Sequence, residues 1–195
     1  MFILNADSFK SAKITIYLCL FNIIFYLVFF LNPNFEIYLL LVQINYNVLE
    51  RLELWRLITS IFLHGDLIHL ISNLIGLVLF GTFVENIVSK IEYIVIYLLS
   101  GIVGNIMSLF LLPPYVISLG ASGAIYGLIG AAVMLIILER NKSQLLITVI
   151  YLIYFVITSF SPGINYASHI FGLILGLILG YAFIRNKIPK KDTYY

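Results

Sequence analysis

Six long apolar runs, each closed by helix-breaking or charged residues, constrain this chain more than any other feature. A helix that spans a bilayer needs about 20 mainly apolar residues. The predicted spanning helices cover residues 14–31, 67–85, 91–112, 122–138, 144–160 and 166–184. Pro113-Pro114 follows the third run and Ser161-Pro162-Gly163 follows the fifth, where proline and glycine end a helix. The sequence therefore predicts an all-α membrane protein with six transmembrane helices in one bundle.

The composition supports the same class. Hydrophobic residues make up 62% of the 195 residues and charged residues 10%, whereas soluble domains are about half apolar and about a quarter charged. The formal net charge is only +2, and no basic stripe with interleaved aromatics appears, so nucleic acid is not expected as a partner. Cys19, the single cysteine, is predicted to be a packing residue. The length allows one membrane domain, residues 1–195.

Positive charge is distributed unevenly between the two sets of predicted loops. Only Arg51 and Arg56 lie on one side, and the other side carries Lys10, Lys13, Lys90, Arg140, Lys142, Arg185, Lys187, Lys190 and Lys191. Lysine and arginine accumulate in cytoplasmic loops. We therefore expect a multi-pass protein of the cell membrane with both termini in the cytoplasm.

The connection between the first two predicted helices, residues 32–65, is long for a helical bundle. It mixes apolar and charged positions and includes Trp55, a residue type that favours the headgroup region. Two interpretations stay open: a segment lying in the membrane interface, or an ordinary amphipathic loop.

Polar residues inside the predicted helices gather at one depth. His69 and Asn73 lie in the first two turns of the second helix, Ser122 begins the fourth, and His169 is near the start of the sixth. These three helices run from the outside inward, so the four residues lie within about 10 Å of the outer ends. Because polar residues are costly in a bilayer, their convergence predicts one functional site that opens to the outer side.

Ser122 and His169 have the chemistry of a nucleophile and a general base. Serine is a weak nucleophile unless a neighbouring base takes its proton, and histidine suits that role near neutral pH. A helix start also places backbone N–H groups near a developing oxyanion. Taken alone, Ser122 between Gly120 and Gly123 would be interpreted as a helix cap and His169 as a hydrogen-bonded structural residue. Together they predict a Ser–His dyad.

Small residues on two helices would allow this pair to meet. Gly172 and Gly176 follow His169 at spacings that form a smooth glycine face, which favours close packing of helices. Tyr126 is one turn beyond Ser122 on the same face and could stack against the His169 ring. Ordinary aromatic packing is the other interpretation of Tyr126.

His69 and Asn73 are four residues apart and share a helix face, so either could donate a hydrogen bond to an oxyanion together with the backbone of Ser122. His64 precedes Gly65 and is either a further support for the site or a structural residue of the loop. Three histidines could bind zinc, but no HExxH spacing is present, and we predict neither metal nor cofactor.

The combination of these residues resembles the rhomboid intramembrane serine proteases in their basic six-helix form. The resemblance covers roughly residues 54–180, and we take residues 54–185 as the core. The matching residues are Trp55-Arg56, His64, His69, Asn73, Gly120-Ala121-Ser122-Gly123 and His169 with Gly172 and Gly176. The combination is highly specific, although each part alone is not.

The resemblance implies a six-transmembrane-helix rhomboid-like bundle in which Ser122 is the nucleophile and His169 the general base. It implies that His69, Asn73 and the Ser122 backbone form the oxyanion site. Family substrates are single-pass membrane proteins, cut near the outer end of a transmembrane helix. The lipid bilayer and such substrates are therefore the expected partners.

The resemblance also implies structural roles for Arg56 in the first loop and for Glu85 at the inner end of the second helix. The residues themselves suggest the same. These two side chains lie at opposite ends of the second helix, so they are not expected to pair with each other, and each is expected to hydrogen-bond loop backbone rather than to act in catalysis. Ser168 is a departure, since the family usually has alanine before the histidine. Serine is small enough to be tolerated there.

Two other functions remain open from the sequence. A catalytically inactive rhomboid-like protein that binds membrane helices would usually lack the serine or the histidine, and both are present here. A small transporter with a histidine relay would carry polar residues through the full bilayer depth, whereas here they cluster in the outer half. A serine endopeptidase is the favoured prediction.

Overall fold

The structure is a computed structural model that describes residues 6–31, 34–139 and 163–188, together with residues 146, 150, 152, 153, 157, 159 and 160. Five apolar helices in these residues are long enough to cross a membrane. They are α2 (Lys13–Leu31), the helix Leu67–Glu85, α8 (Lys90–Leu111), α9 (Ser122–Glu139) and α11 (Tyr166–Ile184). The chain is a multi-pass membrane protein, and five predicted spans are confirmed to within about one residue. The sixth, 144–160, lies outside the described residues except at scattered positions.

Local signals explain where these helices begin. Ser89 and Glu92 form a capping box at the start of α8, in which each side chain bonds the other residue's backbone N–H. Asp66 caps the helix Leu67–Glu85 and Asn165 caps α11. The helix Leu67–Glu85 consists of α6 (Leu67–Gly76), a π-helical segment η2 (Leu77–Gly81) and α7 (Thr82–Glu85).

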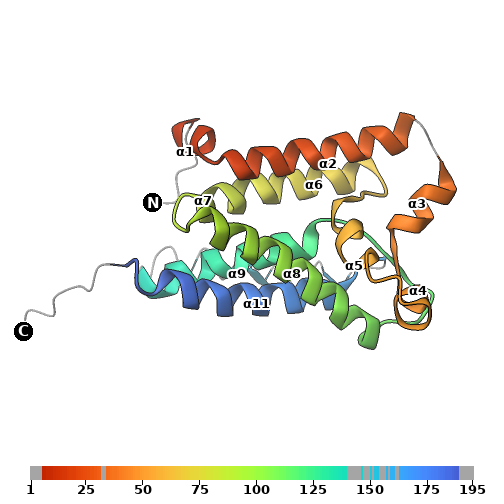
Figure 1. Ribbon diagram of the computed structural model, residues 1–195. Coiled ribbons are helices and arrows are strands. Elements are labelled where there is room, and N and C mark those ends of the chain that lie inside the picture. The colour runs from red at the N-terminus through yellow and green to blue at the C-terminus, as the bar shows by residue number, and fades with distance from the viewer. Residues whose placement is uncertain are drawn as a thin grey trace, which may run out of the picture.

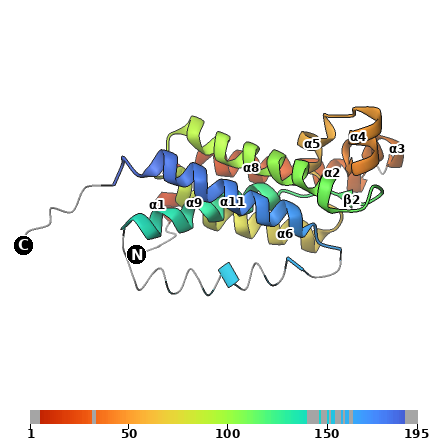
Figure 2. The ribbon, with the colours of Figure 1, turned by 90° about the horizontal axis from the view of Figure 1, so that it is seen from below.

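Helix α9 lies at the centre of the bundle, between α8, α11 and the helix Leu67–Glu85 (Figures 1 and 2). In the 18-residue apolar stretch of α9, 72% of the residues are buried by protein, against 11% in the corresponding stretch of α2. Helix α2 lies along α6, η2 and α7 at the edge of the bundle. The contact between α9 and α11 is backbone on backbone. A Cβ at Gly176 would lie 2.0 Å from the carbonyl oxygen of Gly127, so only glycine fits there.

The segment between α2 and α6 is folded against the end of the bundle where α9 and α11 begin (Figure 1). It contains α3 (Phe35–Leu41), β1 (Gln43–Ile44), α4 (Asn45–Arg51), α5 (Arg56–Thr59) and the 3₁₀ turn η1 (Ser60–Phe62). Strand β1 pairs antiparallel with β2 (Ile117–Ser118), just before α9. Gln43 and Asn45 are fully buried and bond the hydroxyl and carbonyl of Ser108 on α8. This network fixes the loops around the start of α9.

The opposite end of the bundle is held by a carboxylate. Glu85 accepts hydrogen bonds from the backbone N–H groups of Ile14 and Thr15 and from the Thr15 hydroxyl, each at 2.8 Å. These N–H groups belong to the first turn of α2, where backbone N–H groups have no carbonyl acceptor within their own helix. Glu85 therefore caps α2 and joins it to α7, beside the short helix α1 (Ala6–Ser11).

Candidate active site

Ser122 is the first residue of α9 and follows a tight turn. Gly120 has φ +118, a conformation that disfavours any residue with a side chain, and its N–H donates to the Ser60 carbonyl at 2.9 Å. A Cβ at Gly120 would also lie 2.6 Å from Nε2 of His69. The turn therefore brings the start of α9 close to α6 and leaves Ser122 among the N-terminal N–H groups of its helix.

His169 reaches Ser122 from the first turn of α11. Its Nε2 lies 2.7 Å from Oγ of Ser122, a hydrogen-bond distance between atoms 47 residues apart in the chain. The approach depends on glycine, because a Cβ at Gly172 would lie 2.2 Å from the carbonyl oxygen of Gly123. The side chains of the candidate base and the candidate nucleophile are thus in contact at the end of the α9–α11 interface.

Tyr126 supports the His169 ring from one turn along α9. The two rings are stacked, with centroids 4.3 Å apart and planes inclined by 14°. Both residues are buried. This is one of the two interpretations that the sequence left open for Tyr126. The stacked ring restricts the orientations that the His169 side chain can adopt. A catalytic contribution of Tyr126 stays a prediction.

His69 and Asn73 face this pair from α6. The backbone N–H of His69 donates to the Asp66 carboxylate at 2.8 Å, which fixes the first turn of the helix. Asn73 is buried, and its amide nitrogen has no hydrogen-bond acceptor among the described residues. A buried amide donor without a partner is costly, so such a group in the same pocket as the Ser122 hydroxyl is available for a ligand oxygen.

One pocket of about 580 Å³ is lined by all four of the residues that the sequence placed at one depth: His69, Asn73, Ser122 and His169. Ser122, His169 and Tyr126 form one wall, and His69 and Asn73 form the other. Asp66 lines it as well. The pocket holds one carboxylate and several hydroxyl and amide groups, and apolar residues such as Ile125 and Ile129 extend it along α9.

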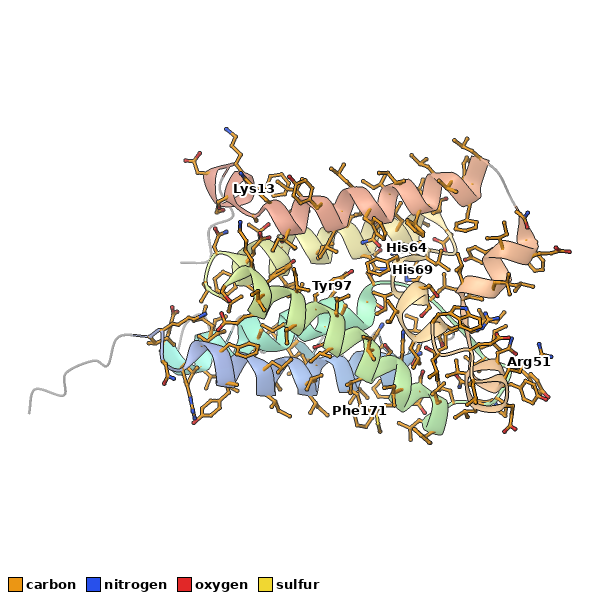
Figure 3. All side chains as sticks on the ribbon, viewed as in Figure 1. Lys13, Arg51, His64, His69, Tyr97 and Phe171 are labelled. Carbon is orange, nitrogen blue, oxygen red and sulfur yellow. The ribbon has the colours of Figure 1, made fainter. Side chains whose placement is uncertain are left out.

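His64 does not line this pocket. It packs edge-on against His69, with ring centroids 5.2 Å apart, and lines a separate pocket of about 340 Å³ with aromatic residues of α2 and α3 (Figure 3). Burial, reinforced by the nearby His69, lowers the pKa of His64 from 6.5 to about 4. Within the described residues, no three His, Cys, Asp or Glu side chains are grouped so that they could hold a metal ion.

Arg56 and Glu85 lie away from the pocket. The buried Arg56 guanidinium donates to the carbonyls of Leu39 and Val42 and pairs with Glu53 at 2.5 Å, so it fastens α3 to α5. Glu85 caps α2 at the opposite end of the bundle. Gly172 and Gly176 act through packing, since both press directly on the α9 backbone.

Ser159 is a part of the site that the sequence did not reveal. It is buried, and its Oγ lies 2.9 Å from Nδ1 of His169 and 2.8 Å from the hydroxyl oxygen of Tyr126. A serine ten residues before His169, at the end of an apolar run, carries no signal of this contact. It arises only in the folded chain, where Ser159 lies against the first turn of α11.

Comparison with known proteins places the chain in a family. A family model described as "Rhomboid domain" matches residues 51–186. The chain belongs to the rhomboid family. The resemblance drawn from the sequence is thereby confirmed, as is the helical membrane fold. The matched region contains every residue that lines the 580 Å³ pocket, whereas the aromatic residues of α2 and α3 precede it.

Relatives with protease names support intramembrane protease activity for this rhomboid. A putative rhomboid protease of Bacillus subtilis, YdcA, is 35% identical over 141 residues, covering 69% of this chain and 70% of the relative. The rhomboid protease GluP of the same organism is 36% identical, covering 73% of this chain and 28% of that protein. Rhomboid-like protease 3 of Toxoplasma gondii is 32% identical, with coverages of 76% and 59%. The chain therefore spans less than two thirds of the last two proteins.

Proposed function

We propose that this rhomboid is an intramembrane serine endopeptidase that cuts single-pass membrane proteins near the outer end of their transmembrane segment. The observation that carries the proposal is the 2.7 Å contact between Ser122 Oγ and His169 Nε2. It lies in a pocket whose opposite wall holds Asn73, a buried amide whose nitrogen has no acceptor in the part of the chain that the structure describes. A nucleophile, a base and a vacant donor are the minimum for acyl transfer.

In this mechanism the Ser122 hydroxyl attacks the carbonyl carbon of the scissile peptide and passes its proton to Nε2 of His169. The carbonyl oxygen becomes an oxyanion, which the Asn73 amide, the His69 ring and the Ser122 backbone N–H stabilise. The tetrahedral intermediate then collapses, and His169 gives the proton to the departing amine. Water, deprotonated by His169, next attacks the acyl group on Ser122. His169 then returns this proton to Ser122 Oγ as the second product leaves, which restores the starting enzyme.

The substrate class follows from the surroundings of the pocket. The pocket lies at the end of helices that cross the membrane, so a peptide bond that enters it comes from the end of a transmembrane segment. A helical peptide bond is hydrogen-bonded and shielded, and must unwind before attack. Substrates with helix-destabilising residues near the cut are therefore expected to be preferred.

Charge supports the orientation. The lysines and arginines at positions 10, 13, 90, 185 and 187 lie at the end of the bundle opposite the pocket, as Lys13 illustrates in Figure 3. By the positive-inside rule this end is cytoplasmic, so the pocket opens to the outer side and both termini are in the cytoplasm.

The test is cleavage of a model single-pass substrate by the purified protein in detergent. Ser122→Ala and His169→Ala are expected to lose at least about 10³-fold in kcat. Asn73→Ala is expected to lose about 10²-fold in kcat with little change in KM, because the donor acts on the oxyanion. Tyr93→Phe, which removes a buried hydroxyl of α8 that bonds Thr15 at the end of the bundle opposite the pocket, is the control and retains activity.

Two results would contradict the proposal. Residual cutting by folded Ser122→Ala would remove Ser122 as nucleophile. A folded wild type that neither cuts a panel of substrates nor reacts with a fluorophosphonate at Ser122 would instead indicate an inactive rhomboid that binds membrane helices.

A further inference from the structure

The second ring nitrogen of His169 has a partner that no part of the proposed mechanism has yet used. Nδ1 lies 2.9 Å from the hydroxyl oxygen of Ser159, and that oxygen lies 2.8 Å from the Tyr126 hydroxyl. Ser159 is 1% exposed, so water does not compete for these bonds. Three side chains from separate parts of the chain thus form a continuous line that ends at Ser122.

The direction of the hydrogen bond at Nδ1 is fixed by the chemistry of the proposed mechanism. A base that takes the Ser122 proton at Nε2 must carry its own proton at Nδ1. Nδ1–H therefore donates to the Ser159 oxygen. A serine hydroxyl has one donor and two acceptor sites, so Ser159 can accept from His169 while it either donates to or accepts from Tyr126. Every hydrogen bond along the line can be satisfied at once.

We propose that Ser159 is a positioning residue of this site, which holds His169 in the tautomer and orientation needed to deprotonate Ser122, and is itself held by the Tyr126 hydroxyl. The proposal rests on the proposed function. Tyr126 then acts twice: its ring stacks on the imidazole, and its hydroxyl orients the serine that binds the far side of the same imidazole.

A hydroxyl suits this buried location better than a carboxylate. A carboxylate beside Nδ1 would stabilise the imidazolium strongly, but it would itself have to be desolvated at membrane depth. The serine oxygen stabilises the protonated ring less, yet enough to favour the charged form that exists during the reaction. Ser159 thus performs a weaker version of the orienting function that an acid performs in soluble serine hydrolases.

The test combines substrate cleavage with the rate at which a fluorophosphonate labels Ser122 in the purified full-length protein. Ser159→Ala is expected to lose about ten-fold in kcat and in labelling rate, with KM within about two-fold, because only the chemistry at His169 changes. The acidic limb of its pH–rate profile moves to lower pH, since the imidazolium loses an acceptor. Ser159→Thr restores most of the rate.

Two further variants separate positioning from packing. Tyr126→Phe keeps the stacked ring and removes only the hydroxyl, and it is expected to lose about three-fold in rate. In the double variant with Ser159→Ala this loss disappears, because the two hydroxyls act through one line of bonds. Tyr93→Phe is the matched control: its buried hydroxyl bonds Thr15 at the end of the bundle opposite the pocket, and its pH profile stays unchanged.

The outcomes distinguish this proposal from the proposed function. If the wild type is labelled and His169→Ala is not, but Ser159→Ala matches the wild type in rate and pH profile, Ser159 has no positioning role. If the wild type is neither labelled nor active, the protease proposal fails first. Should Ser159→Ala not fold, Ser159→Cys replaces it, and an unchanged labelling rate in both Ser159→Cys and Tyr126→Phe overturns the proposal.

Discussion

Helices α11 and α2 are both 19 residues long and almost entirely apolar, yet they join the bundle in different ways. Helix α11 meets α9 through glycines that bring the two backbones into contact. Helix α2 has little buried surface, and its two buried residues, Thr15 and Asn22, are polar. Its aromatic side chains contact Phe62 and Tyr38, and an aromatic-lined pocket of about 340 Å³ lies at one end. Hydrophobicity sends both helices into the membrane; only small residues fix a helix to within a fraction of an ångström.

That difference matches what each helix carries. Helix α11 holds His169 at 2.7 Å from Ser122, and a shift of about 1 Å would break such a contact. Helix α2 contributes no residue to the 580 Å³ pocket. The close packing is therefore found where the proposed catalytic geometry would require it, and the looser packing at a helix that contributes nothing to the pocket.

Gly176→Ala should have the largest effect on the difference between the two helices, because it disrupts the close contact of α11 with α9. The added Cβ would lie 2.0 Å from the Gly127 carbonyl oxygen, so the two helices must separate. We expect a loss of about 3 kcal/mol in stability and of at least about ten-fold in cleavage rate. Thermal unfolding in detergent and substrate cleavage measure the two effects. Ala182→Val, on the exposed face of α11, is the control. Full activity and stability of Gly176→Ala would show that backbone contact is not required.

Glu85→Ala tests the looser helix. It removes three hydrogen bonds to the first turn of α2 and should cost about 2 kcal/mol of stability. The cleavage rate of the fraction that remains folded is expected to be unchanged, because α2 does not contribute to the pocket. A fall in kcat at full stability would mean that α2 communicates with the site. Glu50→Ala, an exposed acid of α4, serves as the comparison for loss of one negative charge.

Acid should weaken the region around α2 through His64. Because burial lowers the pKa of His64 from 6.5 to about 4, the unfolded chain binds a proton more readily than the folded protein between these values. The free energy of unfolding that neutral His64 contributes above pH 6.5 is therefore lost as the pH falls toward 4. At pH 5.5 this loss amounts to about 1 kcal/mol. Thermal unfolding at pH 7.5 and 5.5 measures it. His64→Gln should show a shallower dependence, and an identical one would exclude His64 as the cause.

Local features of the sequence were sufficient to predict much of this protein. Apolar runs and their stops predicted the five described spans, because a bilayer demands the same length and composition of every helix. The family was also predictable, since its residues lie in short segments with fixed spacing, and the match over residues 51–186 confirms it. The same spacing singled out Ser122 and His169, whose roles stay proposals.

Contacts across the chain could not be predicted in the same way. Neither the bond from Ser159 to His169 nor the capping of α2 by Glu85 follows from a local pattern, because serines and glutamates at helix ends are common. The pairing of Gln43 with Ser118, which fixes the turn before α9, is equally remote in sequence. His64 illustrates the limit: the sequence left open whether it supports the site or the loop, and only the fold shows that it packs against His69 and lines a separate pocket.

The sequence by itself thus determined that the chain enters a membrane, where its helices lie, and which residues have the chemistry to act. The tertiary structure alone decided which of those residues meet, at what distance, and with which supporting partners. The physical reason is that insertion into a bilayer depends on composition summed along a segment. A hydrogen bond depends on the position of two atoms to within a few tenths of an ångström, and only the packed fold sets that.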